Sequence, residues 1–149
     1  MSDPVAVAVA LVLAKRWEGF RSHPYLCPAG VATVGYGFTH YADGTTVTLF
    51  DPPMTREAAA TLLEHLVRTK YVRDTLRLCP GVDTPERLGA ITDFIFNLGA
   101  GNLKTSNLRK RINADDWAAV PEQLRRWIRG GGRVLKGLVL RREAEIAYL

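Results

Sequence analysis

One glutamate, one cysteine and one threonine stand close together in the stretch WEGFRSHPYLCPAGVATVGYGFTH, which covers residues 17–40. Glu18 is the only carboxylate in this stretch, eight residues separate it from Cys27, and five more separate Cys27 from Thr33. Cleavage of a glycosidic bond needs an acid that protonates the leaving oxygen and, on the opposite face, a group that places a water or attacks as a nucleophile. A helix end that faces a β-hairpin across a cleft would provide those two faces.

Glu18 is the predicted acid. It follows the apolar Trp17 at the end of a predicted buried helix, and partial desolvation there would raise its pKa and keep it protonated near neutrality. Cys27 has a thiol whose ordinary pKa of about 8.5 leaves a few per cent as thiolate at pH 7, enough to hold a water or act as a base. A direct attack by Cys27 would retain the configuration of the sugar, whereas a water positioned by Cys27 would invert it.

The elements that position these residues begin with a helix over residues 5–17. Asp3 followed by Pro4 is typical of an N-cap and a first helical residue. Residues 19–49 are rich in glycine, threonine and aromatic side chains, and the Asp-Gly pair within ADGT predicts a hairpin between ATVGYGF and TVTL. The sequence therefore predicts a small β region directly after the first helix.

The rest of the chain is predicted to be helical. Thr55 caps a long helix that runs past Tyr71, and Thr84 with Pro85 begins another helix. Its apolar stripe ends at two glycines, and shorter helical pieces lead through GGGR to a final helix from about Leu138. The stripe and its stop consist of Leu88, Ile91, Ile95 and Leu98, followed by Gly99 and Gly101.

These elements predict an α+β fold in a single domain over residues 1–149. A β lobe of about residues 19–53 is inserted after the first helix, and residues 1–18 and 54–149 form a helical lobe. We expect the active-site cleft between the two lobes.

Composition narrows the possible classes of protein. Residues 103–149 carry 11 Lys or Arg against 5 acids, which favours polyanionic partners such as nucleic acid, an anionic membrane or an acidic wall polymer. Cys27 and Cys79 are the only cysteines and are expected to be free thiols in a reducing compartment. The apolar run at residues 5–14 is too short to span a bilayer, and no secretory signal is recognised before it.

Several segments together resemble the phage lysozymes related to the phage T4 enzyme, the endolysin family of glycoside hydrolases. The order and spacing of Glu18, Cys27 and Thr33 resemble that family's catalytic triad, with a thiol at a position that is often a carboxylate. FNLGAGNLKTSNLRKRIN and RRWIRGGGRVLKGLVLRREAE resemble its second half. The resemblance implies a lysozyme-like fold, hydrolysis with inversion, and a hydrogen bond from Thr33 to the attacking water.

The resemblance also implies substrate-binding residues. Tyr36 lies within the GYG of the β region, and Phe96 and Asn97 belong to the FNLG segment that resembles the floor of the cleft. Arg142 aligns with an arginine that pairs with the catalytic glutamate in relatives. Phe38 departs from the family, because relatives commonly have a histidine after the second glycine, and His40 follows two residues later.

The expected function is hydrolysis of the β-1,4 bond between N-acetylmuramic acid and N-acetylglucosamine in peptidoglycan, with no metal and no cofactor. The three histidines, His23, His40 and His65, are scattered without partners. Peptidoglycan is the expected partner of a monomer that binds no nucleic acid and has no transmembrane segment. We expect it to stay in the bacterial cytoplasm until a separate, holin-like lesion opens the membrane, and then to act on the wall in the periplasm.

Two alternatives remain open from the sequence. A lytic transglycosylase would use a lone glutamate to form 1,6-anhydro ends, although the cysteine and threonine at fixed spacing argue against it. A nonenzymatic basic module would use NLRKRI and QLRRWIRGGGR to bind nucleic acid or a membrane surface, and its binding would depend strongly on salt.

Overall fold

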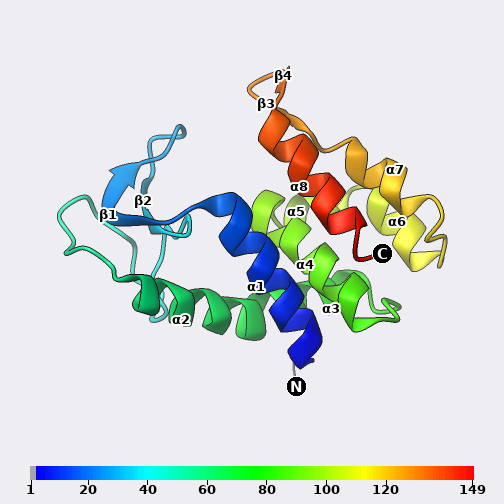
Figure 1. The fold of residues 1–149 in the computed structure, drawn as a ribbon, viewed down its shortest axis with the longest axis horizontal. Helices are drawn as coiled ribbons and strands as arrows, with labels where there is room; N and C mark the ends of the chain where they lie inside the picture. Colours follow the sequence, from blue (N-terminus) through cyan, green and yellow to red (C-terminus); the bar gives the residue numbers. More distant parts are fainter. Residues whose placement is uncertain (1–2) are drawn as a thin grey trace.

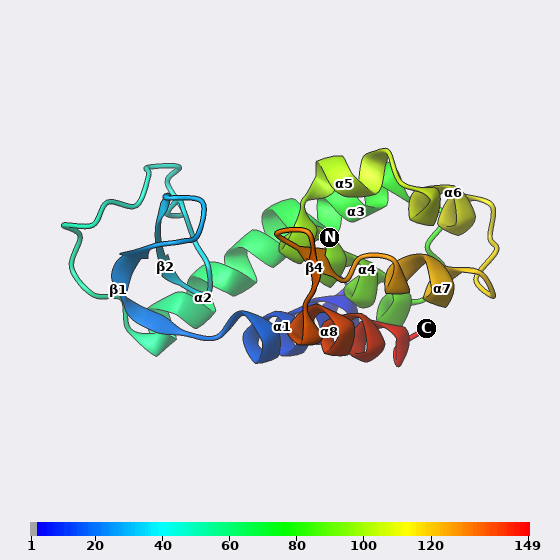
Figure 2. The same ribbon diagram turned by 90° about the horizontal axis from the view of Figure 1, so that it is seen from above.

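The computed structural model describes residues 3–149. A small β lobe and a larger helical lobe lie at opposite ends of the elongated molecule, joined beneath by α2 (Arg56–Leu66) and above by the chain that leaves α1 (Pro4–Glu18) (Figure 1). Seen from above, α2 extends from the β lobe into the helical lobe (Figure 2). Elements from both lobes can therefore line a site between them.

The first helix is fixed at both ends by local chemistry. Asp3 Oδ1 accepts hydrogen bonds from the amides of Val5 at 2.8 Å and Ala6 at 3.2 Å, and Pro4 occupies the first helical position. Gly19 ends the helix with a φ of 69°, directly after Glu18. The predicted helix and its cap are confirmed, and Glu18 is its last residue.

The β lobe differs from the predicted hairpin. β1 (Arg21–Leu26) pairs antiparallel with β2 (Ala32–Gly35). The β2 segment was expected to pair with the segment after the Asp-Gly turn, but its partner is β1, which precedes it in the chain. The turn at Asp43 and Gly44 is present, but it is flanked by a single bridge, between His40 and Thr46. The prediction of a full hairpin around this turn is therefore wrong.

The tight turn of Gly35, Tyr36 and Gly37 explains why β2 is short. The Val34 amide donates to the Phe38 carbonyl at 2.9 Å, and the Phe38 amide donates to the Val34 carbonyl at 2.8 Å. The two glycines adopt φ values of 68° and 81°. Such values disfavour residues with a Cβ. The GYG segment thus reverses the chain and does not continue the strand.

One carboxylate organises the loop that returns from the β lobe. Asp51 accepts hydrogen bonds from the Thr48 amide at 2.9 Å, the Thr48 hydroxyl at 2.7 Å and the Tyr41 hydroxyl at 2.7 Å. These bonds, those from Thr48 first, lower the pKa of Asp51.

The long second helix is continuous in direction but changes its hydrogen bonding. Thr55 accepts a hydrogen bond from the Ala58 amide at 3.0 Å and starts α2, which passes through a π-helical turn, η1 (Val67–Tyr71), into α3 (Val72–Leu78). The predicted cap and the extension past Tyr71 are confirmed. Thr84 caps α4 (Pro85–Leu98) in the same way, and Gly99 ends it with a φ of 91°.

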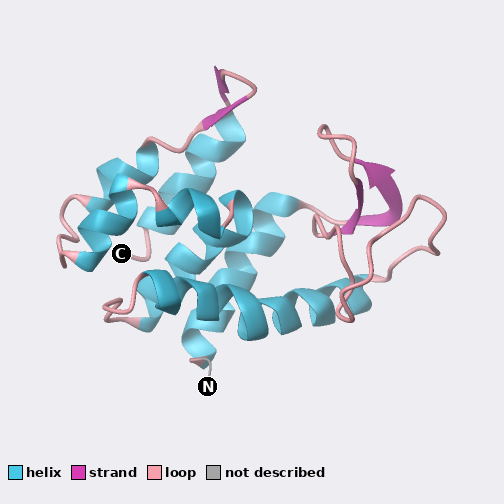
Figure 3. Ribbon diagram, turned by 180° about the vertical axis from the view of Figure 1, so that it is seen from behind, coloured by secondary structure: helices cyan, strands magenta, loops and turns pink. Residues whose placement is uncertain are grey.

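Short elements complete the helical lobe, which Figure 3 shows from behind. Gly101 lies inside α5 (Ala100–Lys104), so it does not help to end α4 as expected. Residues 117–119, within the region expected to contain short helical pieces, form a turn before α7, and the final helix begins two residues earlier than expected. The remaining elements are α6 (Asn107–Asn113), α7 (Val120–Arg125), β3 (Arg129–Gly130), β4 (Arg133–Val134) and α8 (Lys136–Ile146).

The α4 helix is the centre of the core. Every residue from Leu88 to Ile95 is buried, because α1, α3, α5 and α8 pack around it. Two of these buried residues, Thr92 and Asp93, are polar and must find partners inside the protein. No helix within residues 3–149 combines the length and apolar character that crossing a membrane requires.

Candidate active site

A pocket of about 290 Å³ lies between the two lobes with Glu18 in its wall. The β lobe contributes the GYG turn and the residues after it, η1 contributes Lys70 and Tyr71, and α4 contributes its last turn. The lining residues are Glu18, Tyr36, Gly37, Phe38, Thr39, His40, Leu66, Lys70, Tyr71, Phe96 and Asn97. Among the residues predicted to act on substrate, Glu18, Tyr36, Phe96 and Asn97 are brought together here.

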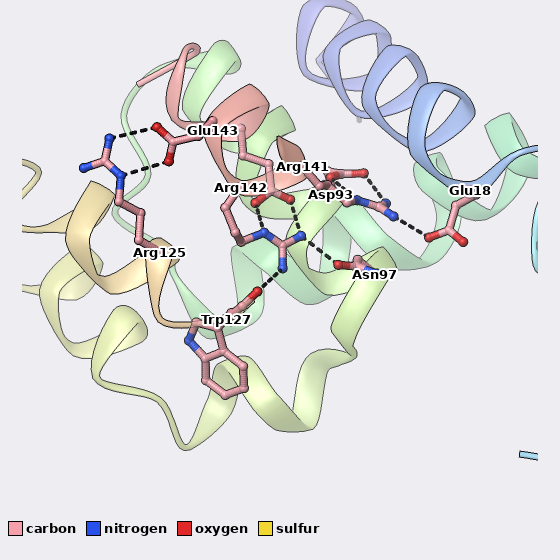
Figure 4. A network of polar contacts seen from close by, with 9 residues as sticks. Glu18, Asp93, Asn97, Arg125, Trp127, Arg141, Arg142 and Glu143 are labelled. Carbon is pink, nitrogen blue, oxygen red and sulfur yellow. Dashed lines mark hydrogen bonds and ion pairs between the residues drawn. The ribbon is translucent and has the colours of Figure 1, made fainter. Parts of the chain in front are cut away.

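Glu18 is held from behind by an arginine of α8. Arg141 Nη1 donates to Glu18 Oε1 at 2.6 Å, while the Glu18 side chain keeps 23% of its surface exposed (Figure 4). The other oxygen, Oε2, faces the GYG turn, where a Cβ added to Gly37 would lie 3.3 Å from it. A side chain at position 37 would therefore crowd the carboxyl that the pocket presents.

Arg141 is itself anchored in the core by Asp93. Its Nε donates to Asp93 Oδ2 at 2.9 Å and its Nη2 donates to Asp93 Oδ1 at 2.7 Å, and both side chains are almost fully buried. Burial alone would lower the pKa of Arg141, but the hydrogen bonds and charge of Asp93, and then the charge of Glu18, raise it above its ordinary value. Arg141 is thus a fixed cation.

The expected pairing of Arg142 with the catalytic glutamate is wrong, since the neighbouring Arg141 makes that contact. Arg142 is completely buried, and its Nη2 donates to Asn97 Oδ1 at 2.7 Å and to Glu145 Oε2 at 3.0 Å. Its Nε lies 2.7 Å from Glu145 Oε1 but is poorly aligned for a hydrogen bond. A direct contact between Arg142 and substrate is excluded by this burial; Arg142 positions Asn97 instead.

Glu145 is a third carboxyl in this network, and like Asp93 it is fully buried. Burial raises the pKa of Glu145 well above its usual range, and Asp93 raises it further, against the charges of Arg142 and Arg141. Burial thus opposes the ionised form of Glu145, while the two neighbouring guanidiniums favour it.

Asn97 links this network to the pocket. Because its Oδ1 accepts from Arg142, its amide NH₂ group is turned the other way. Asn97 and Glu18 also line a neighbouring hollow of about 370 Å³ together with Trp17 of α1 and with residues of α8 and its N-cap. The Tyr71 and Phe96 rings meet edge to face, with their centroids 5.2 Å apart, and support the wall between them.

Cys27 and Thr33 lie together in the β1–β2 hairpin, outside the lining of the 290 Å³ pocket. Hydrogen bonds from the backbone of Val31, then of Ala29, and from the Thr33 side chain lower the pKa of the partly exposed Cys27 thiol. Thr33 is 3% exposed and its hydroxyl donates to Val31 O at 2.9 Å. Burial instead raises the pKa of Cys79 to about 11.

Phe38, which stands where relatives commonly have a histidine, is buried and packs edge to face against Tyr36 with centroids 6.3 Å apart. His40 is exposed at the rim of the pocket, with its Nδ1 2.9 Å from the Thr39 hydroxyl. Within residues 3–149, no group of three or more His, Cys, Asp or Glu side chains is placed to hold a metal ion.

Sequence reasoning missed Asp93, Arg141, Lys70 and Tyr71. A signal existed for the first of these, because an aspartate inside the apolar run AITDFIF must be buried and paired once the helix packs in the core. Lys70 and Tyr71 carried no such signal, since only the packing of η1 against α1 and α4 brings them to the pocket.

The arrangement of two lobes with an acid between them is that of a lysozyme-like glycoside hydrolase. The structure is similar to the active form of the P1 phage endolysin Lyz, with a TM-score of 0.79 and 27% identity, covering 99% of this chain and 83% of that one. The expected lysozyme-like α+β fold is confirmed.

The chain belongs to the phage lysozyme family, whose model matches residues 15–145. It is 39% identical to the SAR-endolysin of Bacteriophage PS119 over 132 residues, which cover 86% of this chain and 73% of that protein. It is 33% identical to the endolysin of Acyrthosiphon pisum secondary endosymbiont phage 1 over 141 residues, covering 92% of each. The chain is therefore a lysozyme, an endolysin that lyses the bacterial cell wall, as the resemblance implied.

Proposed function

We propose that the chain hydrolyses the β-1,4 bond between N-acetylmuramic acid and N-acetylglucosamine, with Glu18 as the general acid. The observation that carries this proposal is the position of Glu18, a single partly exposed carboxyl in the pocket between the lobes, with an arginine behind it. Protonation of the leaving oxygen requires such a group within reach of the bound sugar chain.

The contact with Arg141 decides which oxygen of Glu18 serves as the acid. A guanidinium can only donate hydrogen bonds, so Oε1, which accepts from Nη1 at 2.6 Å, stays an acceptor. The proton is then carried by Oε2, which faces Gly37 and the pocket. Arg141 thereby presents the acidic oxygen to the substrate.

Tyr36, Phe96 and Asn97 form the sugar-binding wall in this proposal. The Asn97 NH₂ group, turned away from Arg142, is the donor for the carbonyl of an N-acetyl group. The half-buried Phe96 ring offers apolar surface to the sugar, and the Tyr36 ring, which is 7% exposed, lines the pocket beside it. Arg142 contributes by orienting the amide of Asn97.

Cys27 is proposed to hold the attacking water together with Thr33, which would invert the configuration at the cleaved carbon. The lowered pKa of Cys27 supports this role, because it increases the thiolate fraction that can accept a hydrogen bond from water. A matched pair of variants tests it: Cys27→Asp should stay active, because aspartate is an ionised acceptor of similar reach, whereas Cys27→Ala should lose most of the rate.

The route to the wall is also proposed. The enzyme, acting as a monomer, accumulates in the cytoplasm and reaches peptidoglycan in the periplasm after a separate membrane lesion. Expression of the chain alone in a Gram-negative host should leave cells intact until the membrane is disrupted. Lysis without such disruption would contradict this route.

The reaction is tested by digestion of purified peptidoglycan with the unaltered chain and the Glu18→Gln variant. Reducing muramic acid ends are expected by mass spectrometry, whereas 1,6-anhydro ends would show a transglycosylase. Glu18→Gln should fold and bind wall fragments but lose about 10² to 10⁴-fold in rate. Glu143→Gln, the same change in an exposed ion pair with Arg125, is the control and should keep the rate.

A further inference from the structure

Three residues from three helices form a continuous chain of hydrogen bonds that ends at Glu18. Arg141 of α8 uses Nη1 for Glu18 of α1, and it uses Nε and Nη2 for the two oxygens of Asp93 of α4, at 2.6, 2.9 and 2.7 Å (Figure 4). Exposure falls along this chain from 23% at the Glu18 side chain to 3% at Arg141 and 0% at Asp93. The guanidinium cannot rotate without breaking two buried bonds.

The charge of Arg141 conflicts with the role of Glu18 as an acid. A cation within about 4–6 Å lowers the pKa of a carboxyl by about 1–3 units, because it stabilises the ionised form. A general acid must be protonated when substrate arrives. An orienting arginine is therefore useful to Glu18 only if another group offsets its charge.

Asp93 is placed to provide this offset. Its carboxylate binds the far side of the guanidinium through two parallel hydrogen bonds, the geometry in which arginine and carboxylate interact most strongly. The adjacent buried pair of Arg142 and Glu145 adds little net charge of its own when Glu145 is ionised, and one positive charge when it is protonated. In either state of Glu145, Asp93 is the carboxylate that binds the guanidinium of Arg141 directly.

The other titratable groups near Glu18 lie on the pocket side. His40 follows the GYG turn, and Lys70 and Tyr71 belong to η1. Burial raises the pKa of Tyr71, and the charges of Asp74 and Glu18 raise it further, so this phenol is neutral in the working range of pH. Lys70 and His40 face solvent, where water screens their charges.

We propose that Asp93 is a positioning residue of the reaction, which holds Arg141 against Glu18 and offsets its charge so that Glu18 is oriented without being fixed as a carboxylate. This inference rests on the proposed role of Glu18 as the acid. It assigns to a fully buried residue of α4 an effect on the pH at which the enzyme works.

The test is the titration of Glu18 in the full chain, followed by ¹³C NMR of labelled glutamate carboxyls and assigned with Glu18→Gln. In Asp93→Asn the Glu18 signal should titrate about one pH unit lower than in the unaltered chain, since the charge of Arg141 is no longer offset. The alkaline limb of kcat/KM against pH should move down by a similar amount. Asp83→Asn, the same change in an exposed pair with Arg87, is the control and should move neither curve.

A double variant keeps the proposal testable if Asp93→Asn alone does not fold. Asp93→Asn with Arg141→Gln removes both charges, so the Glu18 signal should move up by less than about one unit. A rise of about two units or more would show that Arg141 acts on Glu18 without an offset and would overturn the proposal. An unchanged titration in a folded Asp93→Asn would do the same.

The two proposals fail in different ways. Activity retained by Glu18→Gln would refute the acid role whatever the NMR titration shows. A titration of Glu18 that ignores Asp93 would refute the offset even if Glu18→Gln is inactive.

Discussion

Gly89 lies within α4 where α1 crosses it, so one added methyl group there should force apart the two helices that position the site. A Cβ at Gly89 would lie 2.6 Å from Val9 Cβ, 2.8 Å from Val9 Cγ1 and 2.7 Å from the backbone oxygen of Ala6. Carbon atoms in packed interiors are normally about 3.5–4.0 Å apart. Because a backbone oxygen cannot rotate away, α1 itself must move.

The expected energy is a difference between two effects of Gly89→Ala. Alanine gains about 1 kcal/mol over glycine inside a helix. Overpacking of a core costs about 1–3 kcal/mol, and the clash with backbone places this site at the upper end. The net loss is therefore about 2 kcal/mol, from about 3 less about 1, which corresponds to a fall in Tm of about 4–8 °C for a domain of this size.

Thermal and urea denaturation measure this loss, and Gly101→Ala in α5 is the matched control. A Cβ at Gly101 meets nothing within 4 Å, so that variant should be at least as stable as the unaltered chain. Displacement of α1 also moves Glu18 away from Asn97 on α4, and a shift of about 1 Å can cost about 10²-fold in rate. A Gly89→Ala variant with unchanged Tm and lytic rate would refute this reasoning.

Iodoacetamide should alkylate Cys27 in the folded chain and stop wall lysis, because its thiol is partly exposed and has a lowered pKa; peptide mass spectrometry that finds Cys27 unmodified would contradict this. Asp51→Asn should lower Tm above pH 3.8. The hydrogen bonds to Asp51, those from Thr48 first, lower its pKa and so stabilise the folded protein when this carboxyl is ionised. The difference from the unaltered chain should vanish as the pH falls through the lowered pKa, and a difference that persists at low pH would be the opposite result. Arg142→Met should cost about 3–5 kcal/mol in urea denaturation, because it leaves the buried polar groups of Glu145 without their partner; a loss below about 1 kcal/mol would mean that the pair contributes little.

The first residues of the main helices could be predicted from N-cap residues in the adjacent sequence. Asp3, Thr55 and Thr84 each accept a hydrogen bond from an amide two or three residues later, a contact that depends only on adjacent sequence. The stop at Gly99 is similar, since its φ of 91° suits glycine. These features could be predicted because no distant part of the chain takes part in them.

Strand pairing could not be read in the same way. The Asp43-Gly44 turn formed as its residues predict, yet β2 pairs with β1 and ends at the GYG turn. A strand can use either neighbour as its partner, and the choice depends on which pairing buries Val34 and Phe38 in the core.

The sequence by itself determined the family, the order of the elements and the position of Glu18 at the end of a helix beside a β lobe. The tertiary structure decided which arginine reaches it. Residues 141 and 142 are neighbours in sequence, but side chains one residue apart on a helix point about 100° away from each other. The packing of α8 on α1 and α4 therefore turns Arg141 toward Glu18 and Asp93, and turns Arg142 toward Asn97 and the buried side of the helix.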